Sequence, residues 1–249
     1  MRWSDEAVVL SARRHGESGL LVHVFTPGHG RHAGLVRGGQ RPKARVIYQI
    51  GNRLLATWSA RLAEHLGTIT AELAHGYAAV LIAAPPRLAC LAAAAALADA
   101  ALPEREPHPR AYQGLIALLD ALEADAGWAS TYVAWEMVVL AELGFGLDLE
   151  RCAATGLTDD LAYVSPRTGR AVSQAAGEPY RERLLALPAF LRADAAAAAV
   201  SVPADVLAGL ALTGHFLERR AFAPHGRALP AARTRFVDVL KQLATISGR

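Results

Sequence analysis

The chain has 249 residues, of which 53% are hydrophobic and 20% are charged. This composition excludes an intrinsically disordered protein and fits one large domain or two ordinary ones. Two cysteines, Cys90 and Cys152, are too few for a disulfide framework, and no signal peptide is recognisable at the start. The longest apolar run, residues 88–98, is shorter than the roughly 20 residues that cross a bilayer. We therefore expect a cytoplasmic protein without a membrane segment.

Positive charge is concentrated in the first third of the chain. The formal net charge is +3, but residues 1–80 contain ten Lys and Arg against five Asp and Glu. The rest of the chain holds 16 basic residues against 18 acidic ones. This asymmetry is typical of a nucleic-acid-binding face. A solvated basic surface without a ligand is the plainer alternative.

The first third predicts five short strands separated by turns. The clearest alternation runs through residues 53–62, where Leu54, Ala56 and Trp58 share one side of the strand. This pattern predicts an apolar inner face and a mostly polar, basic face along a wet outer groove. Trp58 is interpreted as barrel core and not as a platform for stacking bases, because it shares the parity of Leu54. The five predicted strands cover residues 6–13, 20–25, 31–37, 53–62 and 69–73.

The rest of the chain predicts helices, with the change marked by Pro85 and Pro86. Five strands in about 70 residues match a small closed barrel of the OB type, although an SH3-like barrel fits the strand count almost as well. The fold class is therefore α+β, with an N-terminal five-stranded OB-type β-barrel followed by a mainly α-helical domain. We place the domains at 1–80 and 81–249, with an irregular insert at about 146–180. The predicted helices cover residues 87–102, 111–125, 129–143 and 203–219 and a last segment from 230, with short helical pieces over 181–192.

No pattern in the chain indicates an enzyme, a cofactor or a metal. The glycines between Gly28 and Gly34 resemble a phosphate-binding loop, but the residues that follow predict a strand, so a hairpin is favoured. His29 and His32 have no third ligand nearby and are interpreted as polar turn residues. Nucleophile, metalloprotease and P-loop motifs are absent from the sequence. We expect a binding protein.

The basic residues of the first third are the candidate DNA contacts. Arg13 and Arg14 lie at the turn between the first two strands, and Arg61 lies before the turn between the last two. In OB folds these two loops flank the groove that takes single strands. Arginine suits such a role through bidentate phosphate contacts and stacking on bases. The predicted DNA-binding residues are Arg13, Arg14, Arg31, Arg37, Arg41, Lys43, Arg45, Arg53 and Arg61.

Several of these stretches resemble the RecO family of DNA repair proteins. The N-terminal segments Glu6-Ala-Val-Val-Leu, Arg14-His-Gly-Glu-Ser-Gly and Arg37-Gly-Gly carry the likeness, which continues through residues 141–152 and 163–172. The resemblance implies a recombination mediator that binds single- and double-stranded DNA and anneals complementary strands. It further implies engagement of the C-terminal tail of single-stranded-DNA-binding protein, loading of RecA together with RecR, RecF as a further partner, and association with the nucleoid.

The chain departs from the family in its insert. Many members carry a zinc-binding quartet of two CxxC pairs, whereas Cys152-Ala-Ala-Thr155 keeps one cysteine and Ser173-Gln-Ala-Ala176 keeps none. Because one thiolate cannot form a closed tetrahedral site, we predict an insert without zinc.

An alternative function remains open from the sequence. The helical domain would dock proteins as an adaptor, and the barrel would not touch DNA. A DNA face elsewhere, on Arg219, Arg220 and Arg227, is a further alternative if the barrel arginines do not contribute.

Overall fold

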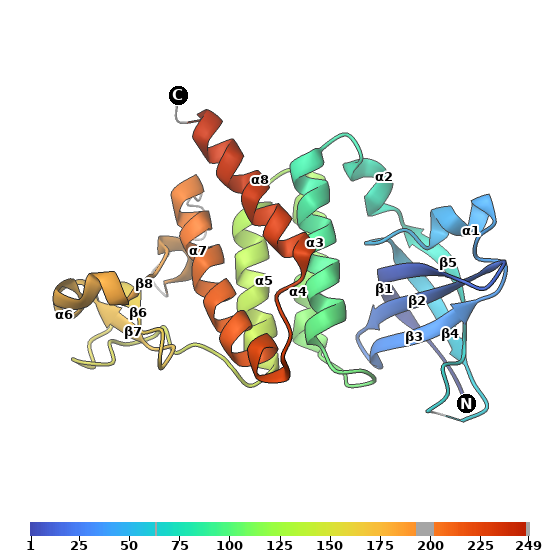
Figure 1. Ribbon diagram of the computed structural model, residues 1–249, viewed down its shortest axis with the longest axis horizontal. Coiled ribbons are helices and arrows are strands. Elements are labelled where there is room, and N and C mark those ends of the chain that lie inside the picture. Colours follow the sequence, from blue (N-terminus) through green and yellow to red (C-terminus); the bar gives the residue numbers. More distant parts are fainter. Residues whose placement is uncertain (63, 193–201, 248–249) are drawn as a thin grey trace. The chain divides into compact units, whose positions relative to one another are not determined.

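The computed structural model describes residues 1–62, 64–192 and 202–247 (Figure 1). The chain divides into two compact units. The first comprises Met1–Ala126 with Pro230–Arg233, and the second comprises Gly127–Leu229 with Thr234–Arg249. The division into domains 1–80 and 81–249 stays a prediction. Among the described residues, no helix is both long and apolar enough to cross a membrane.

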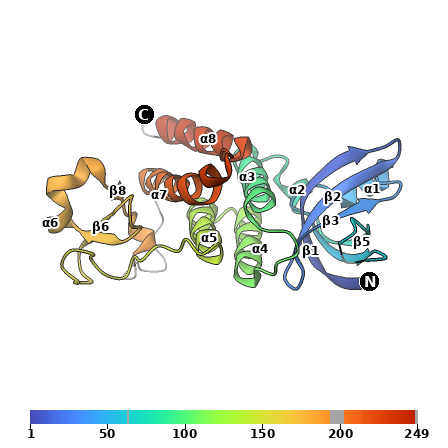
Figure 2. The ribbon, with the colours of Figure 1, turned by 60° about the horizontal axis from the view of Figure 1, so that its bottom comes forward.

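The first unit begins with a closed five-stranded barrel (Figure 2). The strands follow each other around the ring in the order β1-β2-β3-β5-β4. The first strand is antiparallel to both β2 and β4, and β3 meets β5 in parallel at the pair Leu35 and Thr68. This order confirms the OB-type barrel. The strands are β1 (Arg2–His15), β2 (Gly19–Thr26), β3 (Gly30–Val36), β4 (Arg53–Ser59) and β5 (Thr68–His75).

The barrel is filled by the side chains that alternation assigned to its interior. Leu54, Ala56 and Trp58 of β4 are all buried, which confirms the predicted inner face and the core role of Trp58. Burial of these apolar side chains is the main favourable term in forming the barrel. The buried core comprises Ala7, Val9, Leu20, Val22, Val24, Val36, Tyr48, Leu54, Ala56, Trp58 and Ile69.

The ring closes between β3 and β5 through the pair Leu35 and Thr68, a backbone hydrogen bond from the Leu35 N–H to the Gly67 carbonyl at 3.0 Å, and the side chain of Trp58. The indole N–H of Trp58 lies 3.2 Å from the Ala33 carbonyl oxygen and 3.1 Å from that of Leu66, so it donates to both sides of the seam. Gly34 and Gly67 leave the room for this contact. An added Cβ at Gly34 would lie 2.6 Å from the side chain of Ile69, and one at Gly67 would lie 2.5 Å from the indole.

A short helix covers the core at one end of the barrel. This helix, α1 (Pro42–Ile47), lies between β3 and β4, where the sequence predicted no helix or strand. Proline suits its first turn. The following Tyr48 is part of the barrel core, and the buried Asn52 donates its amide to the carbonyls of Val46 and Ile47 at the helix end.

Three further helices complete the first unit. They are α2 (Tyr77–Leu81), α3 (Pro85–Ala101) and α4 (Pro109–Ala124), of which α2 was not predicted. The outer side of the barrel packs on them: the rings of Phe25 and Tyr112 lie 5.5 Å apart, and His23 Nδ1 lies 2.6 Å from Asp99 Oδ1. His23 of β2 therefore faces away from the barrel core and toward α3.

The second unit combines helices with a small sheet. The sequence indicated an irregular insert at about 146–180, but this segment contributes strands β6 (Leu161–Val164) and β7 (Ala171–Ser173), which with β8 (Leu185–Ala186) form a sheet of order β7-β6-β8. These strands are too short to show a period of two. The remaining elements are α5 (Trp128–Glu142), α6 (Gln174–Gly177), η1 (Glu178–Arg183), η2 (Ala189–Leu191), α7 (Pro203–Phe216), η3 (Leu217–Phe222), η4 (Ala223–His225) and α8 (Ala231–Ser247).

The seam of the barrel supplies a first testable prediction. Replacing Trp58 by Phe keeps an aromatic ring but removes the N–H, which leaves the carbonyls of Ala33 and Leu66 without this donor. We expect a loss of about 1–3 kcal/mol, the usual cost of an unsatisfied buried polar group. Hydrogen exchange at the amides of β3 and β5 measures it. Trp128→Phe, in the second unit, is the matched control, and equal protection in both variants contradicts the role of the indole in closure.

Candidate nucleic-acid interface

Strand register brings most of the predicted cations to one end of the barrel. Arg14 pairs with Leu20 across the first hairpin, and Leu20 pairs with Val36 across the second. The end of β1 and the end of β3 are therefore close, and α1 follows directly from β3. We call the resulting group the basic end cluster, and it comprises Arg13, Arg14, Arg37, Arg41, Lys43 and Arg45.

Gln40 fixes the segment between β3 and α1 to the first hairpin. Its side-chain amide lies 3.1 Å from the carbonyl oxygens of both Gly16 and Gly19 and donates to them. Its backbone N–H donates to the Ser18 carbonyl at 3.0 Å. Sequence reasoning missed this residue, because a glutamine between a glycine pair and a proline gives no local signal of such contacts.

A hollow between the two segments has cationic walls. It has a volume of about 320 Å³ and is bordered by Arg14 from β1 and Arg45 from α1. The lining is mixed, with Leu20 and Ile50 beside the polar Gln40 and Gln49. The arrangement places two guanidinium groups beside apolar side chains, which suits a polyanion with flat rings, because guanidinium binds phosphate and apolar side chains accept bases.

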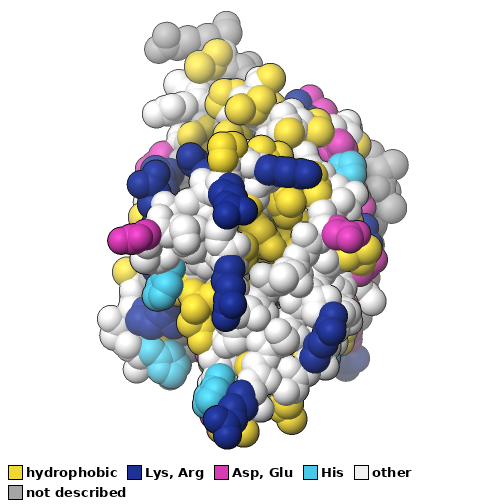
Figure 3. All heavy atoms as spheres, turned by 90° about the vertical axis from the view of Figure 1, so that its right-hand side faces the viewer, with side chains coloured by type: hydrophobic (Ala, Val, Ile, Leu, Met, Phe, Trp, Pro, Cys, Tyr) yellow, Lys and Arg dark blue, Asp and Glu magenta, His cyan; other side chains and the backbone are white. Residues whose placement is uncertain are grey.

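The six cations of the basic end cluster are free to meet a ligand. All six residues are exposed, and within the described part of the chain none of them forms an ion pair. Figure 3 shows the Lys and Arg side chains of this side of the molecule spread around hydrophobic patches, with acidic side chains mostly toward the margins. Glu17, at the tip of the first hairpin, is the acidic residue within this group of loops.

Two of the predicted DNA contacts, Arg31 and Arg53, are paired with other groups of the protein. The side chain of Arg31 donates from Nε to the Leu102 carbonyl at 2.9 Å and lies 3.5 Å from Asp99 and 3.6 Å from Glu104. Burial by itself raises the pKa of Asp99, but the adjacent His23 and Arg31 hold it below its usual value. Arg31 is thus half-buried between strand and helix, where a phosphate has no access.

Arg53 and Arg61 also lie outside the basic end cluster. Arg53 donates to Glu6 at 2.7 Å, and this hydrogen bond raises the pKa of the guanidinium. Arg61 is exposed in the loop after β4. Because β4 is antiparallel to β1, this loop lies at the opposite end of the barrel from the first hairpin.

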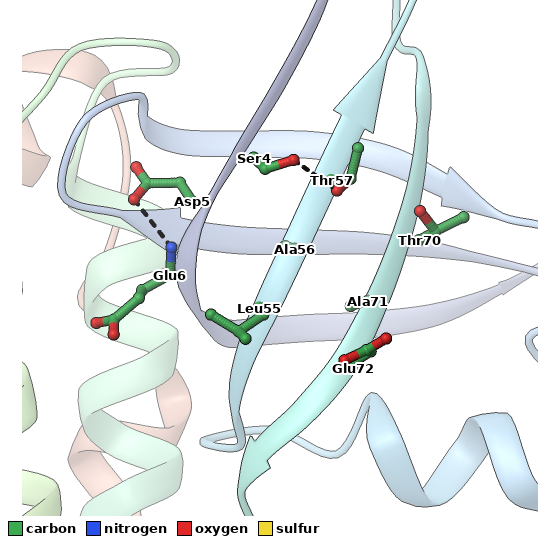
Figure 4. A pocket seen from close by; sticks show the side chains of 9 residues that line it. All are labelled: Ser4, Asp5, Glu6, Leu55, Ala56, Thr57, Thr70, Ala71 and Glu72. Atoms are coloured by element: carbon green, nitrogen blue, oxygen red, sulfur yellow. Dashed lines mark hydrogen bonds between the residues drawn. The ribbon is translucent and has the colours of Figure 1, made fainter.

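The outer face of β1, β4 and β5 is acidic where the sequence indicated a basic groove (Figure 4). A hollow of about 520 Å³ on this face is lined by Asp5, Glu6 and Glu72; Glu6 and Glu72 share the outer face with Leu55, whereas the Asp5 carboxylate points away and accepts from the Gly28 backbone N–H. The interpretation from β4 alone was wrong about the charge, because the neighbouring strands supply these acids and Glu6 neutralises Arg53. Carboxylates repel phosphate, so this hollow does not favour DNA.

In the insert, the two segments that would each carry a CxxC pair lie side by side, but their side chains do not supply the ligands that zinc needs. Ser173 donates its backbone N–H to the Cys152 sulfur at 3.3 Å and its hydroxyl at 3.4 Å. The two segments that would carry CxxC pairs are therefore neighbours. A zinc site needs four such ligands, and only one thiolate is present. Among the described residues, no group of three or more His, Cys, Asp and Glu could hold a metal ion. A zinc-free insert stays a prediction.

Two of the three alternative arginines of the second unit have local partners, whereas Arg219 is exposed. Arg220 lies 5.0 Å from the ring of Phe216 and donates to the Arg167 carbonyl, and Arg227 lies 5.3 Å from the ring of Phe222. Cation–π contacts of this kind hold the side chains against the helix. Arg220 and Arg227 are therefore less available to DNA than the residues of the basic end cluster.

The comparisons with known proteins agree with this architecture over the whole chain. Residues 1–77 match the family described as Recombination protein O N terminal, and residues 83–228 match Recombination protein O C terminal. The chain is 57% identical to the DNA repair protein RecO of Rhodospirillum centenum, with 100% of this chain and 98% of the relative covered. It is 51% identical to the corresponding protein of Rhodospirillum rubrum, with 97% of each covered, and 50% identical to that of Phenylobacterium zucineum.

An OB-type barrel followed by a helical domain places the chain in the class of recombination mediators, which are not enzymes. The chain belongs to the RecO family of DNA repair proteins. Its function lies in DNA repair and recombination, and DNA and recombination proteins are the partners that this membership implies.

The thiol of Cys152 supplies a second testable prediction. Burial raises its pKa, but hydrogen bonds from Ser173 and Thr155 outweigh burial and lower the pKa to about 6. The unfolded thiol titrates near 8.5. Because the folded pKa is depressed, the stabilisation is fully present above the unfolded pKa and is lost as the pH falls through the folded value. We expect the free energy of unfolding of wild type relative to Cys152→Ser to rise from pH 6 to pH 9.

Thiolate absorbance gives a direct measurement of the same group. The difference in absorbance between wild type and Cys152→Ser removes the contribution of Cys90, and its midpoint should lie near 6. A midpoint near the ordinary thiol value would contradict the hydrogen-bonded thiolate.

Proposed function

We propose that this chain is a recombination mediator that binds single- and double-stranded DNA through the basic end cluster. In this proposal it anneals complementary strands and, with RecR, helps load RecA onto strands coated by single-stranded-DNA-binding protein. The observation that carries the proposal is a set of six exposed cations at one end of the barrel, none of which forms an ion pair with a residue that the structure describes. Family membership supports the action on DNA repair. The predicted contacts Arg31 and Arg53 take structural roles instead.

The annealing step needs electrostatics and no covalent chemistry. Two complementary strands repel each other through their phosphates, and a cluster of cations lowers this repulsion while the bases find their partners. The hollow is bordered by two guanidinium groups, that of Arg14 from β1 and that of Arg45 from α1, and its lining includes the apolar side chains of Leu20 and Ile50. Partner proteins, namely RecR, RecF and the C-terminal tail of single-stranded-DNA-binding protein, belong to the proposal on the strength of the family.

Salt dependence tests the DNA contact. Each phosphate neutralised on a single strand contributes about −0.7 to the slope of log affinity against log salt. We expect the variant Arg13→Gln, Arg14→Gln, Arg41→Gln to flatten the slope by about 2, measured by fluorescence anisotropy with labelled oligo(dT). The matched control replaces Arg151, Arg183 and Arg235, which are exposed cations of the second unit, by Gln. Equal slopes in the two variants place the DNA face elsewhere.

Annealing is measured on the same variants with two complementary labelled strands. The basic end cluster variant should lose the acceleration of annealing that wild type gives, because the phosphates then repel without compensation. If wild type binds no oligonucleotide at low salt, the mediator proposal fails and the adaptor function is favoured. In that case binding of a protein partner should survive the arginine substitutions unchanged.

A further inference from the structure

An aromatic cradle lies at the end of the barrel opposite the basic end cluster. The start of β1 pairs with the end of β4, since Arg2 is opposite Ser59, and Trp3 is opposite Trp58. A hollow of about 540 Å³ opens beside these strands. We define the aromatic cradle as Trp3, His29, His32 and Trp58, which line this hollow together with Arg2 and Arg105.

The four rings of the cradle pack on one another. Trp3 and Trp58 are stacked, with centroids 5.9 Å apart and planes at 15°. The ring of His29 lies 4.2 Å from Trp3, and His32 meets Trp58 edge-on at 4.8 Å. Trp58 and His32 are buried and form the floor, whereas Trp3 and His29 are half-buried and form the wall. Part of each of these two rings therefore remains accessible from the hollow.

His32 carries polar groups that the protein leaves unsatisfied. Its side chain is 95% buried, since its relative exposure is 5%, and neither ring nitrogen has a hydrogen-bond partner within the described structure. Burial lowers its pKa, so the ring is neutral at neutral pH, with one donor and one acceptor nitrogen. A buried polar group without a partner costs free energy unless a ligand supplies the partner. A mostly apolar hollow with one such polar group in its floor is typical of a site that binds a small ring-shaped ligand.

Two arginines stand at the border of the hollow. Arg2 is exposed at the start of β1, and Arg105 is held in place by bonds from its side chain to the Glu64 and His65 carbonyls at 3.1 and 3.3 Å. Arg105 has a left-handed backbone, with φ of 63°, which only a defined loop maintains. Both cations flank the rings without any ion pair within the described residues.

We propose that the aromatic cradle holds one unpaired base of a single strand, with Trp3 and His29 as the stacking surface and Arg2 and Arg105 on the flanking phosphates. This inference rests on the proposed function and deepens it. An unpaired base with its phosphates complements the site in three ways. Its flat ring packs on the aromatic side chains, its polar edge can hydrogen-bond to His32, and the phosphates on either side pair with the two arginines. A single DNA strand that contacts both ends of the barrel is then held by ion pairs with its phosphates at one end and by base stacking at the other.

The test separates stacking from charge. Stacking on one aromatic side chain changes affinity on the order of tenfold, so Trp3→Leu should weaken binding of oligo(dT) by about that factor while the salt slope stays unchanged. An oligonucleotide of abasic nucleotides should bind wild type more weakly by a similar factor, and Trp3→Leu should lose this discrimination. The control Trp128→Leu replaces a half-buried tryptophan outside the cradle and should match wild type.

Photocrosslinking keeps the proposal testable if Trp3→Leu is unstable. Wild type crosslinked to an oligonucleotide with 5-iodouracil should yield adducts on the peptides that contain Trp3 or His29. Adducts confined to the basic end cluster, or equal abasic discrimination in wild type and Trp3→Leu, would overturn the cradle while leaving the proposed function intact. If wild type binds no oligonucleotide at all, the proposed function is wrong, and the cradle proposal fails with it.

A peptide is the competing occupant, because a carboxylate and an aromatic side chain also fit an apolar site with two arginines. The probe is a synthetic acidic peptide with an aromatic C-terminal residue, measured on the same variants. If Trp3→Leu abolishes peptide binding and leaves oligo(dT) affinity unchanged, the cradle is a peptide site and the base proposal is wrong. If oligo(dT) affinity alone falls, the base proposal holds.

Discussion

The hydrogen bonds of the Trp58 indole across the seam between β3 and β5 are the contact on which the barrel depends. At this seam the strands share the pairing of Leu35 with Thr68, and the indole adds donors to carbonyls on both sides. Gly34 and Gly67 keep the space for the ring. Closure there fixes both ends of the barrel at once. The same indole is part of the aromatic cradle, whereas Gln40 fixes the loops of the basic end cluster.

The distribution of charge follows from which cations the tertiary structure neutralises. Asp99 and Glu104 come from the end of α3 and the loop after it, and they remove Arg31 from the candidate interface. Glu6 does the same for Arg53. Six exposed cations that form no ion pair within the described residues are grouped at one end, because the first hairpin, the end of β3 and α1 converge there, while Arg2, Arg61 and Arg105 lie toward the opposite end. A potential made by neighbouring unpaired cations is stronger at a phosphate than the same charges dispersed over a surface.

In the second unit the segments at Cys152 and Ser173 are neighbours, joined by hydrogen bonds from the Ser173 backbone N–H and hydroxyl to the Cys152 sulfur. Donors at a thiolate offset part of the cost of burying its charge, and here they lower the pKa of the thiol. Ser173 is the last residue of β7, so the same contacts tie the Cys152 segment to the sheet β7-β6-β8.

The sequence by itself determined the barrel strands, the inward parity of Leu54, Ala56 and Trp58, the hairpin at Gly28–Gly30 and the concentration of charge in the first third. These are local signals, since alternation and turn residues act between near neighbours in the chain. Only the tertiary structure decided α1, the strands of the insert, and the sorting of cations into free and neutralised ones. The helix has six residues and depends on Tyr48 and Asn52, and the partners of Arg31 lie some seventy residues away in the chain. Contacts between residues so far apart leave no periodic pattern in the sequence, so neither the acidic outer hollow nor the aromatic cradle could be predicted without the structure.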